Sequence, residues 1–324
     1  MPSNALMVEL WRGPALESRH AVHAVLMDGK GRVKASYGDA DRPTFPRSSL
    51  KPLQAIALME TGAAAEFKLS NAEIALACAS HSGEQNHVLT AGNWLARLGL
   101  DENALECGAH APYASPCAPA TILSNNCSGK HTGMLTLCRH MKQDHAGYTE
   151  FNHPAQHKIM TTVGEMCGVT ITRGTCGVDG CSAPNPLMPL SALASGFARF
   201  MQPDTLGIAR GTACRHLYQA MVEHPELVGG TGRLDTILMK AAAGKIMCKI
   251  GGEGVYACVI PEQDTVIALK AEDGHTRAAQ ASLYAILEKH ALTDAKTLEA
   301  ARPVALPVQK NWRGIEVGTV QVHS

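Results

Sequence analysis

The chain has 324 residues, 45% hydrophobic and 18% charged, which is enough for one large domain or two smaller ones with a sizeable core. Lysine plus arginine and aspartate plus glutamate both number 29, so the net charge is about zero and no basic surplus predicts nucleic-acid binding. Aromatic residues make up 4%, which argues against recognition by base stacking. No apolar run reaches the length of a membrane span, so we expect no membrane partner.

The cysteines predict a reducing compartment. All eleven are spread from Cys78 to Cys258 instead of being clustered, and an odd number cannot all pair. The start, Met1-Pro2-Ser3-Asn4, lacks the charged and apolar segments of a secretion signal. We therefore expect a cytoplasmic protein with reduced thiols.

The first part of the chain has strand patterns. Strands are expected at residues 6–12, 20–28 and 32–37, with a glycine turn before the third. Pro43 and Pro46 then end the extended structure. Apolar residues at helical spacing predict a helix that begins near Ser48 and ends at about residue 62.

The middle of the chain is predicted to be helical. Ser70-Asn71-Ala72-Glu73 fits a capping box before a short helix. Residues 101–123 have no clear period and predict a long irregular connection. Further helices are expected at 86–99, from about 131 through His145, and at 153–167, 189–202, 204–223 and 233–243.

The end of the chain returns to strands, with a hairpin at 255–260 and 265–269, a helix at 275–290 and a strand at 314–322. Strands from both chain ends must pair to bury a face, because an isolated hairpin is marginal. This predicts an α/β protein of the α+β type: a mixed, mostly antiparallel sheet of N- and C-terminal strands, flanked by helices, with a central helical region. We expect a single domain over 1–324, with its sheet part at about 1–65 and 245–324 and its helical part at about 66–244.

The strongest local candidate for chemistry is Ser48-x-x-Lys51. Residues three apart lie on the same face of a helix, and a desolvated lysine amine can take the proton of a serine hydroxyl. A helix start near Ser48 would also place backbone N–H groups where they stabilise negative charge. The alternative is a helix cap beside a solvated lysine.

Two further segments are candidates. Ser80-His81-Ser82-Gly83-Glu84 gathers hydroxyls, an imidazole and a carboxylate after a short helix, although a polar loop with a glycine turn would look the same. Lys249 precedes Gly251-Gly252-Glu253-Gly254, where glycines allow close approach of backbone to a ligand. Lys245 is a competing choice, and a tight turn with a solvated lysine is the simpler explanation.

Cysteines on two glycine-bearing loops predict a possible metal site. Cys127-x-x-Lys130-His131 and Cys181 would supply two thiolates, and zinc favours thiolates but needs four ligands. From the residues alone the other ligands remain open among His131, Asp179, water and a lysine amine. Free structural thiols are the alternative.

Together these segments resemble the rhizobial-type, class 3 L-asparaginases, the asparaginase II family. The resemblance rests on Arg47-Ser48-Ser49-Leu50-Lys51, Ser80-His81-Ser82-Gly83-Glu84, Asn126-Cys127-Ser128-Gly129-Lys130-His131, Gly177-Val178-Asp179-Gly180-Cys181 and Lys249-Ile250-Gly251-Gly252-Glu253-Gly254, in this order. It spans residues 6–322. It implies a fold similar to serine β-lactamases and glutaminases.

The resemblance also implies roles. Ser48 would be the nucleophile with Lys51 as its base, and Ser80 with Lys249 would form a second Ser–Lys pair. A structural or substrate-positioning Zn²⁺ would be held by Cys127, Lys130 and Cys181. Asp179 would suit the substrate's ammonium group, with Arg47 and His131 near the same pocket.

The expected activity is hydrolysis of L-asparagine to L-aspartate and ammonia by a homodimer. A glutaminase or β-lactam-type serine hydrolase of the same fold is the alternative, since one methylene is worth only about 1–3 kcal/mol of selectivity. A zinc hydrolase in which Ser48 is incidental is a second alternative. A non-catalytic amino-acid or metal-binding protein, such as a thiol-rich zinc store, is a third, but storage has no use for activated hydroxyls.

Overall fold

The computed structural model describes residues 4–323. Met1-Pro2-Ser3, on which part of the expectation about a secretion signal was based, lies outside the described residues. The chain forms two compact units. The sheet unit contains the described residues up to Ser49, Met188–Met201 and the described residues from Gly232 onward, and the helical unit contains Leu50–Leu187 and Gln202–Thr231.

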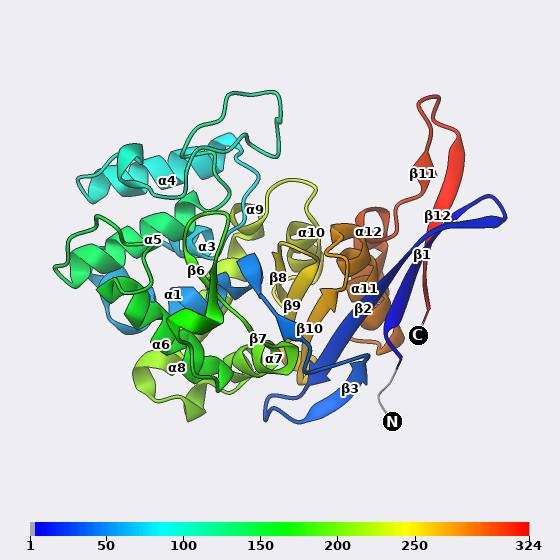
Figure 1. Ribbon diagram of the computed structural model, residues 1–324, viewed down its shortest axis with the longest axis horizontal. Coiled ribbons are helices and arrows are strands. Elements are labelled where there is room, and N and C mark those ends of the chain that lie inside the picture. Colours follow the sequence, from blue (N-terminus) through cyan, green and yellow to red (C-terminus); the bar gives the residue numbers. More distant parts are fainter. Residues whose placement is uncertain (1–3, 324) are drawn as a thin grey trace. The chain divides into compact units, whose positions relative to one another are not determined.

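An eight-stranded antiparallel sheet forms the centre of the sheet unit (Figure 1). Its order is β11-β12-β1-β2-β10-β9-β8, and β3 also pairs with β2. The strands are β1 (Leu6–Arg12), β2 (Ala15–Met27), β3 (Val33–Tyr37), β8 (Met247–Gly251), β9 (Val255–Ile260), β10 (Thr265–Ala271), β11 (Gln309–Lys310) and β12 (Glu316–His323). N- and C-terminal strands therefore share one sheet, as predicted.

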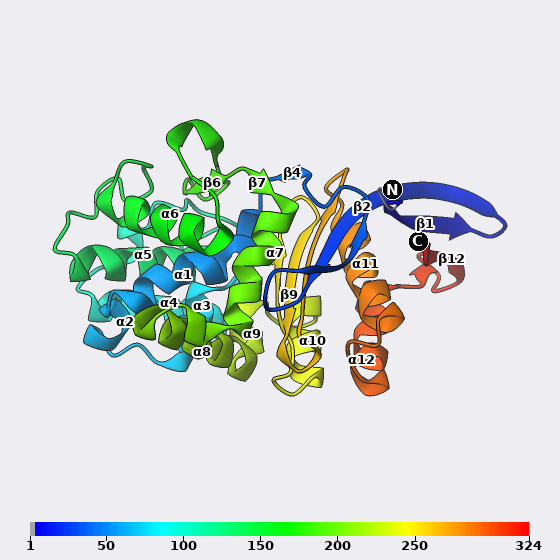
Figure 2. The same ribbon diagram turned by 90° about the horizontal axis from the view of Figure 1, so that it is seen from below.

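Helices cover both faces of this sheet, with α7 on one side and α11 on the other (Figure 2). Strand β9 is buried at every position, because its two faces are both covered. The helices of this unit are α7 (Leu190–Ala198), α10 (Leu234–Ala241), α11 (Thr276–Lys289) and α12 (Ala295–Ala305). A short separate pair joins β4 (Pro43–Thr44) to β7 (Met188–Pro189).

Helix α1 (Lys51–Glu60) is the centre of the helical unit, packed against α3, α5, α6 and α8 (Figure 1). All its residues from Lys51 to Leu58 are buried. The other helices are α2 (Ala63–Glu66), α3 (Asn71–Ala77), α4 (Gln85–Arg97), α5 (Ser128–His140), α6 (Pro154–Cys167), α8 (Ile208–Glu223) and α9 (Pro225–Val228), and β5 (Cys176–Val178) pairs with β6 (Pro184–Pro186). The predicted capping box of α3 is present, with reciprocal bonds between Ser70 and Glu73.

Several expected boundaries differ from the structure. The helix predicted near Ser48 begins as a 3-10 turn, η1 (Arg47–Leu50), and becomes α-helical at Lys51. Helix α5 ends at His140 and not at His145, because Lys142 adopts a left-handed conformation that no α-helix continues through. Helix α12 was not predicted. The division between the two parts also differs from the expected one. Residues 50–65 were expected in the sheet part and lie in the helical unit, whereas residues 188–201 and 232–244 were expected in the helical part and lie in the sheet unit.

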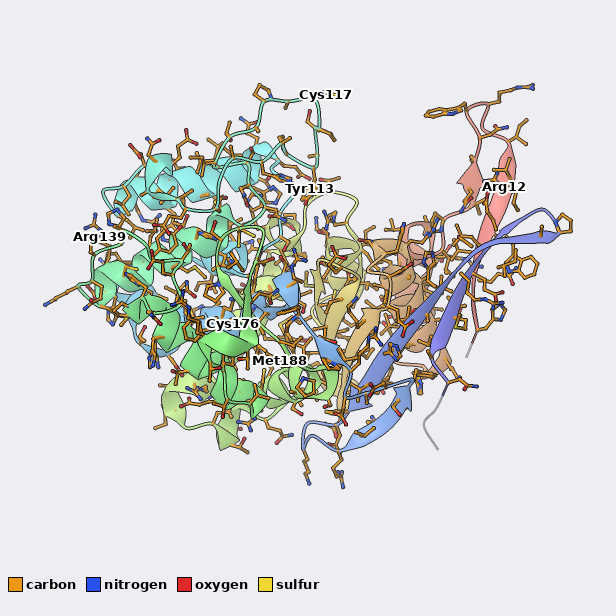
Figure 3. The ribbon with its side chains drawn as sticks, in the orientation of Figure 1. Arg12, Tyr113, Cys117, Arg139, Cys176 and Met188 are labelled. Carbon is orange, nitrogen blue, oxygen red and sulfur yellow. The ribbon has the colours of Figure 1, made fainter. Side chains whose placement is uncertain are left out.

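The thiols and the long connection match their predictions. All eleven cysteines are free. Residues 101–123 contain a short 3-10 turn, η2 (Glu102–Ala104), and one isolated bridge, and are otherwise irregular. Cys117 is exposed on this connection (Figure 3). Within residues 4–323, no helix is long and apolar enough to cross a membrane.

Candidate active site

In the sheet unit, Ser48 lies half-buried in the η1 turn that leads into α1. The backbone N–H and the hydroxyl of Ser49 both donate to the carbonyl oxygen of Pro46, at 3.2 and 2.7 Å. Arg47 has a left-handed backbone with φ of 54°. The α-helical start is thus three residues later than expected, and the Ser49 amide already has a partner.

Strand β8 passes directly beside this turn because it ends in a glycine. A Cβ atom on Gly251 would lie 2.5 Å from the Pro46 carbonyl oxygen and 3.2 Å from the Ser49 nitrogen. Only a residue without a side chain allows this approach. The strand that carries Lys249 and the turn that carries Ser48 are therefore neighbours within one unit.

Burial separates the two candidate lysines of this strand region. The Lys249 side chain is 1% exposed, and its Nζ donates to the carbonyl oxygen of Ile250 at 2.8 Å and lies 4.0 Å from the Asp235 carboxylate. The Lys245 side chain is 59% exposed and pairs with Glu262 at 3.1 Å. Lys245 thus has the solvated surface environment, and Lys249 has the desolvated one.

Arg47 faces a carboxylate of its own unit. Its guanidinium lies 3.9 Å from Glu253, and the side chain is about a third exposed. Both residues have left-handed φ angles, 54° and 55°, which non-glycine residues adopt at an energetic cost of order 1–3 kcal/mol each. Such strain is typical of functional sites, and the remaining exposure leaves the guanidinium accessible to an anionic group.

In the helical unit, Lys51 is the first residue of α1 and is 1% exposed. Its Nζ donates to the Ser80 hydroxyl oxygen at 3.0 Å and to the carbonyl oxygens of Ala79 and Asn126. All three partners are uncharged. This contact between Lys51 and Ser80 was not predicted. Sequence spacing paired Lys51 with Ser48, and the family resemblance implied a pair of Ser80 with Lys249.

Hydrogen bonds fix the loop that carries Ser80. The Ser80 N–H donates to Val228, and the Ser82 hydroxyl donates to the carbonyl oxygen of Gly229. His81 is fully buried, and its Nδ1 accepts from the Gly83 N–H. Nε2 therefore carries the proton and donates to the Ser128 hydroxyl at 2.9 Å, which ties the loop to the start of α5. The Ser-His-Ser cluster was identified from sequence, but this role of His81 was not.

Cys127, Lys130 and Cys181 come together in the helical unit. Both cysteines are buried, and Lys130 Nζ lies 3.0 Å from the Cys181 sulfur. A hydrogen bond from Cys127 lowers the pKa of Cys181 far below its ordinary value, and Lys130 acts in the same direction. Burial opposes the charge on Lys130, but the neighbouring sulfurs raise its pKa. Cys181 is thus a thiolate, held by a thiol and an ammonium.

This donor set fits zinc, on the chemistry of its atoms. Two sulfurs and an amine nitrogen converge, and the metal would bind as Cys127 and Lys130 lose their protons. Among residues 4–323, no group of three or more His, Cys, Asp and Glu side chains is arranged to hold a metal. A metal at the two cysteines therefore depends on the lysine nitrogen.

His131 and Asp179 lie in the surroundings of these thiols. His131 is fully buried. The Tyr148 hydroxyl accepts from the Glu106 N–H and donates its proton to His131 Nδ1 at 2.6 Å. Nε2 then carries a proton, and the ring also interacts with the Cys181 sulfur. Burial lowers the pKa of His131, which keeps the ring neutral. Asp179 is half-buried and raises the pKa of Lys130.

The model of the family described as L-asparaginase II matches residues 8–322, nearly the whole chain. The chain belongs to the L-asparaginase II family. The protein is therefore an amidohydrolase that converts L-asparagine to L-aspartate and ammonia.

Other comparisons add less. A solved structure of a β-lactamase from Mycobacterium bovis aligns over 78% of this chain and 88% of its own chain. The two sequences are 14% identical, and the TM-score is 0.44. A search of curated proteins found no match.

Proposed function

We propose that Ser48 is the nucleophile of this asparaginase and that Lys51 is its general base. The observation that carries the proposal is the environment of Lys51: a fully buried amine whose partners are all neutral oxygens, one helical turn after Ser48. A desolvated lysine amine held by hydroxyl and carbonyl oxygens is suited to take the proton of a nearby serine hydroxyl. A solvated surface lysine lacks this property.

The reaction would proceed through an ester. Lys51 removes the Ser48 proton, and the oxygen attacks the side-chain amide carbon of asparagine. Backbone N–H groups near Ser48 stabilise the oxyanion, each good donor being worth about 3 kcal/mol. The tetrahedral intermediate then expels ammonia, whose nitrogen takes the proton held by Lys51, and a β-aspartyl ester remains on Ser48. Water hydrolyses that ester to aspartate and frees Ser48. Ser80, whose hydroxyl bonds to Lys51 Nζ, relays protons. Lys249 assists both the formation and the hydrolysis of the ester.

Three residues are proposed to bind the ends of the substrate. Arg47 has an accessible guanidinium for the α-carboxylate, and Asp179 suits the α-ammonium group. His131, fully buried beside the Cys181 sulfur, is the third residue near the same substrate groups. A pocket for glutamine would need room for one more methylene, so a glutaminase preference is the second candidate.

Cys127, Lys130 and Cys181 are proposed to hold zinc. The metal would supply positive charge that joins the start of α5 to the loop after β5 and orients substrate groups. The catalytic roles above belong to the serines and lysines. We also propose a cytoplasmic homodimer, which light scattering would report as twice the chain mass of 34.3 kDa.

The decisive experiment measures ammonia release from asparagine and from glutamine with wild type and Ser48→Ala, before and after chelation. We expect Ser48→Ala to lose at least about a thousandfold in kcat with asparagine, because the covalent route is removed. Full activity of Ser48→Ala would exclude the nucleophile assignment. Activity that survives in Ser48→Ala but disappears on chelation would favour a zinc hydrolase.

A further inference from the structure

A buried carboxylate lies behind Lys249 in the sheet unit. Asp235 is in the first turn of α10, its side chain is 2% exposed, and its Oδ2 lies 4.0 Å from Lys249 Nζ. An ammonium group as buried as Lys249 is strongly destabilised unless an opposite charge is close. Asp235 supplies that charge. Nothing in the Ser-x-x-Lys or glycine motifs pointed to this residue.

Asp235 is itself held firmly in place. The Tyr256 hydroxyl donates a short hydrogen bond to Oδ1, and the Ile250 N–H donates to Oδ2 at 3.2 Å. Tyr256 is fully buried on β9, and burial raises its pKa well above the ordinary value, so it remains a neutral donor. One carboxylate thus connects α10, β8 and β9 at the point where Lys249 sits.

The next carboxylate along the chain, Glu253, is 67% exposed and lies 3.9 Å from the Arg47 guanidinium, so it is solvated and faces another cation. Cys248 on β8 and Cys258 on β9 are buried thiols, and burial raises the pKa of both. Two cationic groups are also near. Arg233 precedes α10, and the Arg47 guanidinium lies against Gly252, just beyond β8. Within this set, Asp235 is the buried carboxylate beside Lys249.

We infer that Asp235, held by Tyr256, is a positioning residue that keeps Lys249 as an ammonium group beside the Ser48 turn. This inference rests on the proposed catalytic role of Lys249. It divides the work between the two lysines. Lys51, surrounded by uncharged oxygens, accepts protons, whereas Lys249, paired with a carboxylate, donates hydrogen bonds.

The test compares Asp235→Asn and Tyr256→Phe in the full-length enzyme, measuring kcat and KM for asparagine between about pH 5 and pH 10. Asparagine keeps the shape of the side chain but removes the charge. We expect Asp235→Asn to lower kcat at least about tenfold at pH 8. The alkaline limb of the pH profile should also move down by about one pH unit or more, because the Lys249 ammonium loses its proton more easily without the Asp235 charge. Tyr256→Phe keeps the carboxylate charge and should leave that limb in place.

Asp28→Asn is the matched control, since Asp28 is a buried carboxylate of the same unit that bonds to the 30–32 turn and does not contact Lys249. It should leave the pH profile unchanged. An Asp235→Asn enzyme with wild-type rate and profile would overturn the inference. So would a folded Asp235→Asn enzyme whose activity falls equally at every pH, because that indicates a structural role alone.

Lys249→Met separates this inference from the function on which it rests. If Lys249→Met keeps full activity, the catalytic role of Lys249 is wrong. If Lys249→Met is inactive and Asp235→Asn behaves as wild type, only the role of Asp235 is wrong. In the double variant, Asp235→Asn should cause no further loss, since it acts through Lys249.

Discussion

At the scale of single residues, Gly251 and Gly252 differ in how much space they leave for a side chain. A Cβ on Gly251 would meet backbone atoms of Pro46 and Ser49 at 2.5 and 3.2 Å, and neither can move without shifting the η1 turn. A Cβ on Gly252 would meet the Arg47 guanidinium at 3.4 Å, and that group sits at the end of a flexible side chain. The turn that carries Ser48 therefore depends on Gly251 more than on Gly252.

We expect Gly251→Ala to lower kcat at least about tenfold, because a displacement of the nucleophile by a fraction of an ångström misaligns attack. Gly252→Ala should affect mainly KM, through Arg47. Steady-state kinetics on both variants, with melting temperatures as a check of folding, measures this. Equal losses of kcat in the two variants would contradict the argument.

At the scale of elements, Glu60 joins three helices of the helical unit. This residue ends α1, and its buried carboxylate accepts from Lys158 and Thr162 of α6 and from Arg210 of α8, at 2.7–3.2 Å. Burial by itself would raise the pKa of Glu60, but these hydrogen bonds hold it at about 2. The carboxylate is thus ionised over the working pH range and fixes the C-terminal end of the helix that begins with Lys51.

The pKa of Glu60 is lower in the folded state than its ordinary value of 4.5, so its contribution to stability is present above pH 4.5 and is lost as the pH falls to about 2. We predict that Glu60→Gln lowers the free energy of unfolding by about 2–3 kcal/mol at pH 7. The gap between variant and wild type should narrow as the pH falls from about 5 to 2. Urea unfolding at several pH values would detect it, and a gap independent of pH would show that the charge is unimportant.

At the scale of the whole molecule, the proposed zinc site connects segments far apart in the sequence, since Lys130 and Cys181 are in contact. A metal bound in the native state stabilises it by about 2.7 kcal/mol at a hundred times its Kd. We expect one zinc per chain by elemental analysis, a lower melting temperature after chelation, and loss of the zinc in Cys181→Ser. Cys117→Ser, which changes an exposed thiol, should keep both zinc and stability. A full zinc content in Cys181→Ser would exclude the site.

Much of the architecture followed from local patterns. Strand alternation near both termini and helical periodicity between them predicted the sheet of terminal strands and the helical middle, because burial of one face imposes those periods. The Ser70 capping box needed only four residues. Helix α12 was missed although its alanines favour a helix, because Pro303 lies inside it and proline usually ends a helix.

The sequence by itself determined the family, since five short motifs in order specify it, and it predicted the reactive side chains. Tertiary structure alone decided which partners those side chains meet. Lys51 contacts Ser80, 29 residues away, and Lys249 faces Asp235 across α10 and β8. The physical reason is that periodicity reports which face of an element is buried, whereas the charge state of a buried lysine depends on atoms brought beside it by the packing of distant elements.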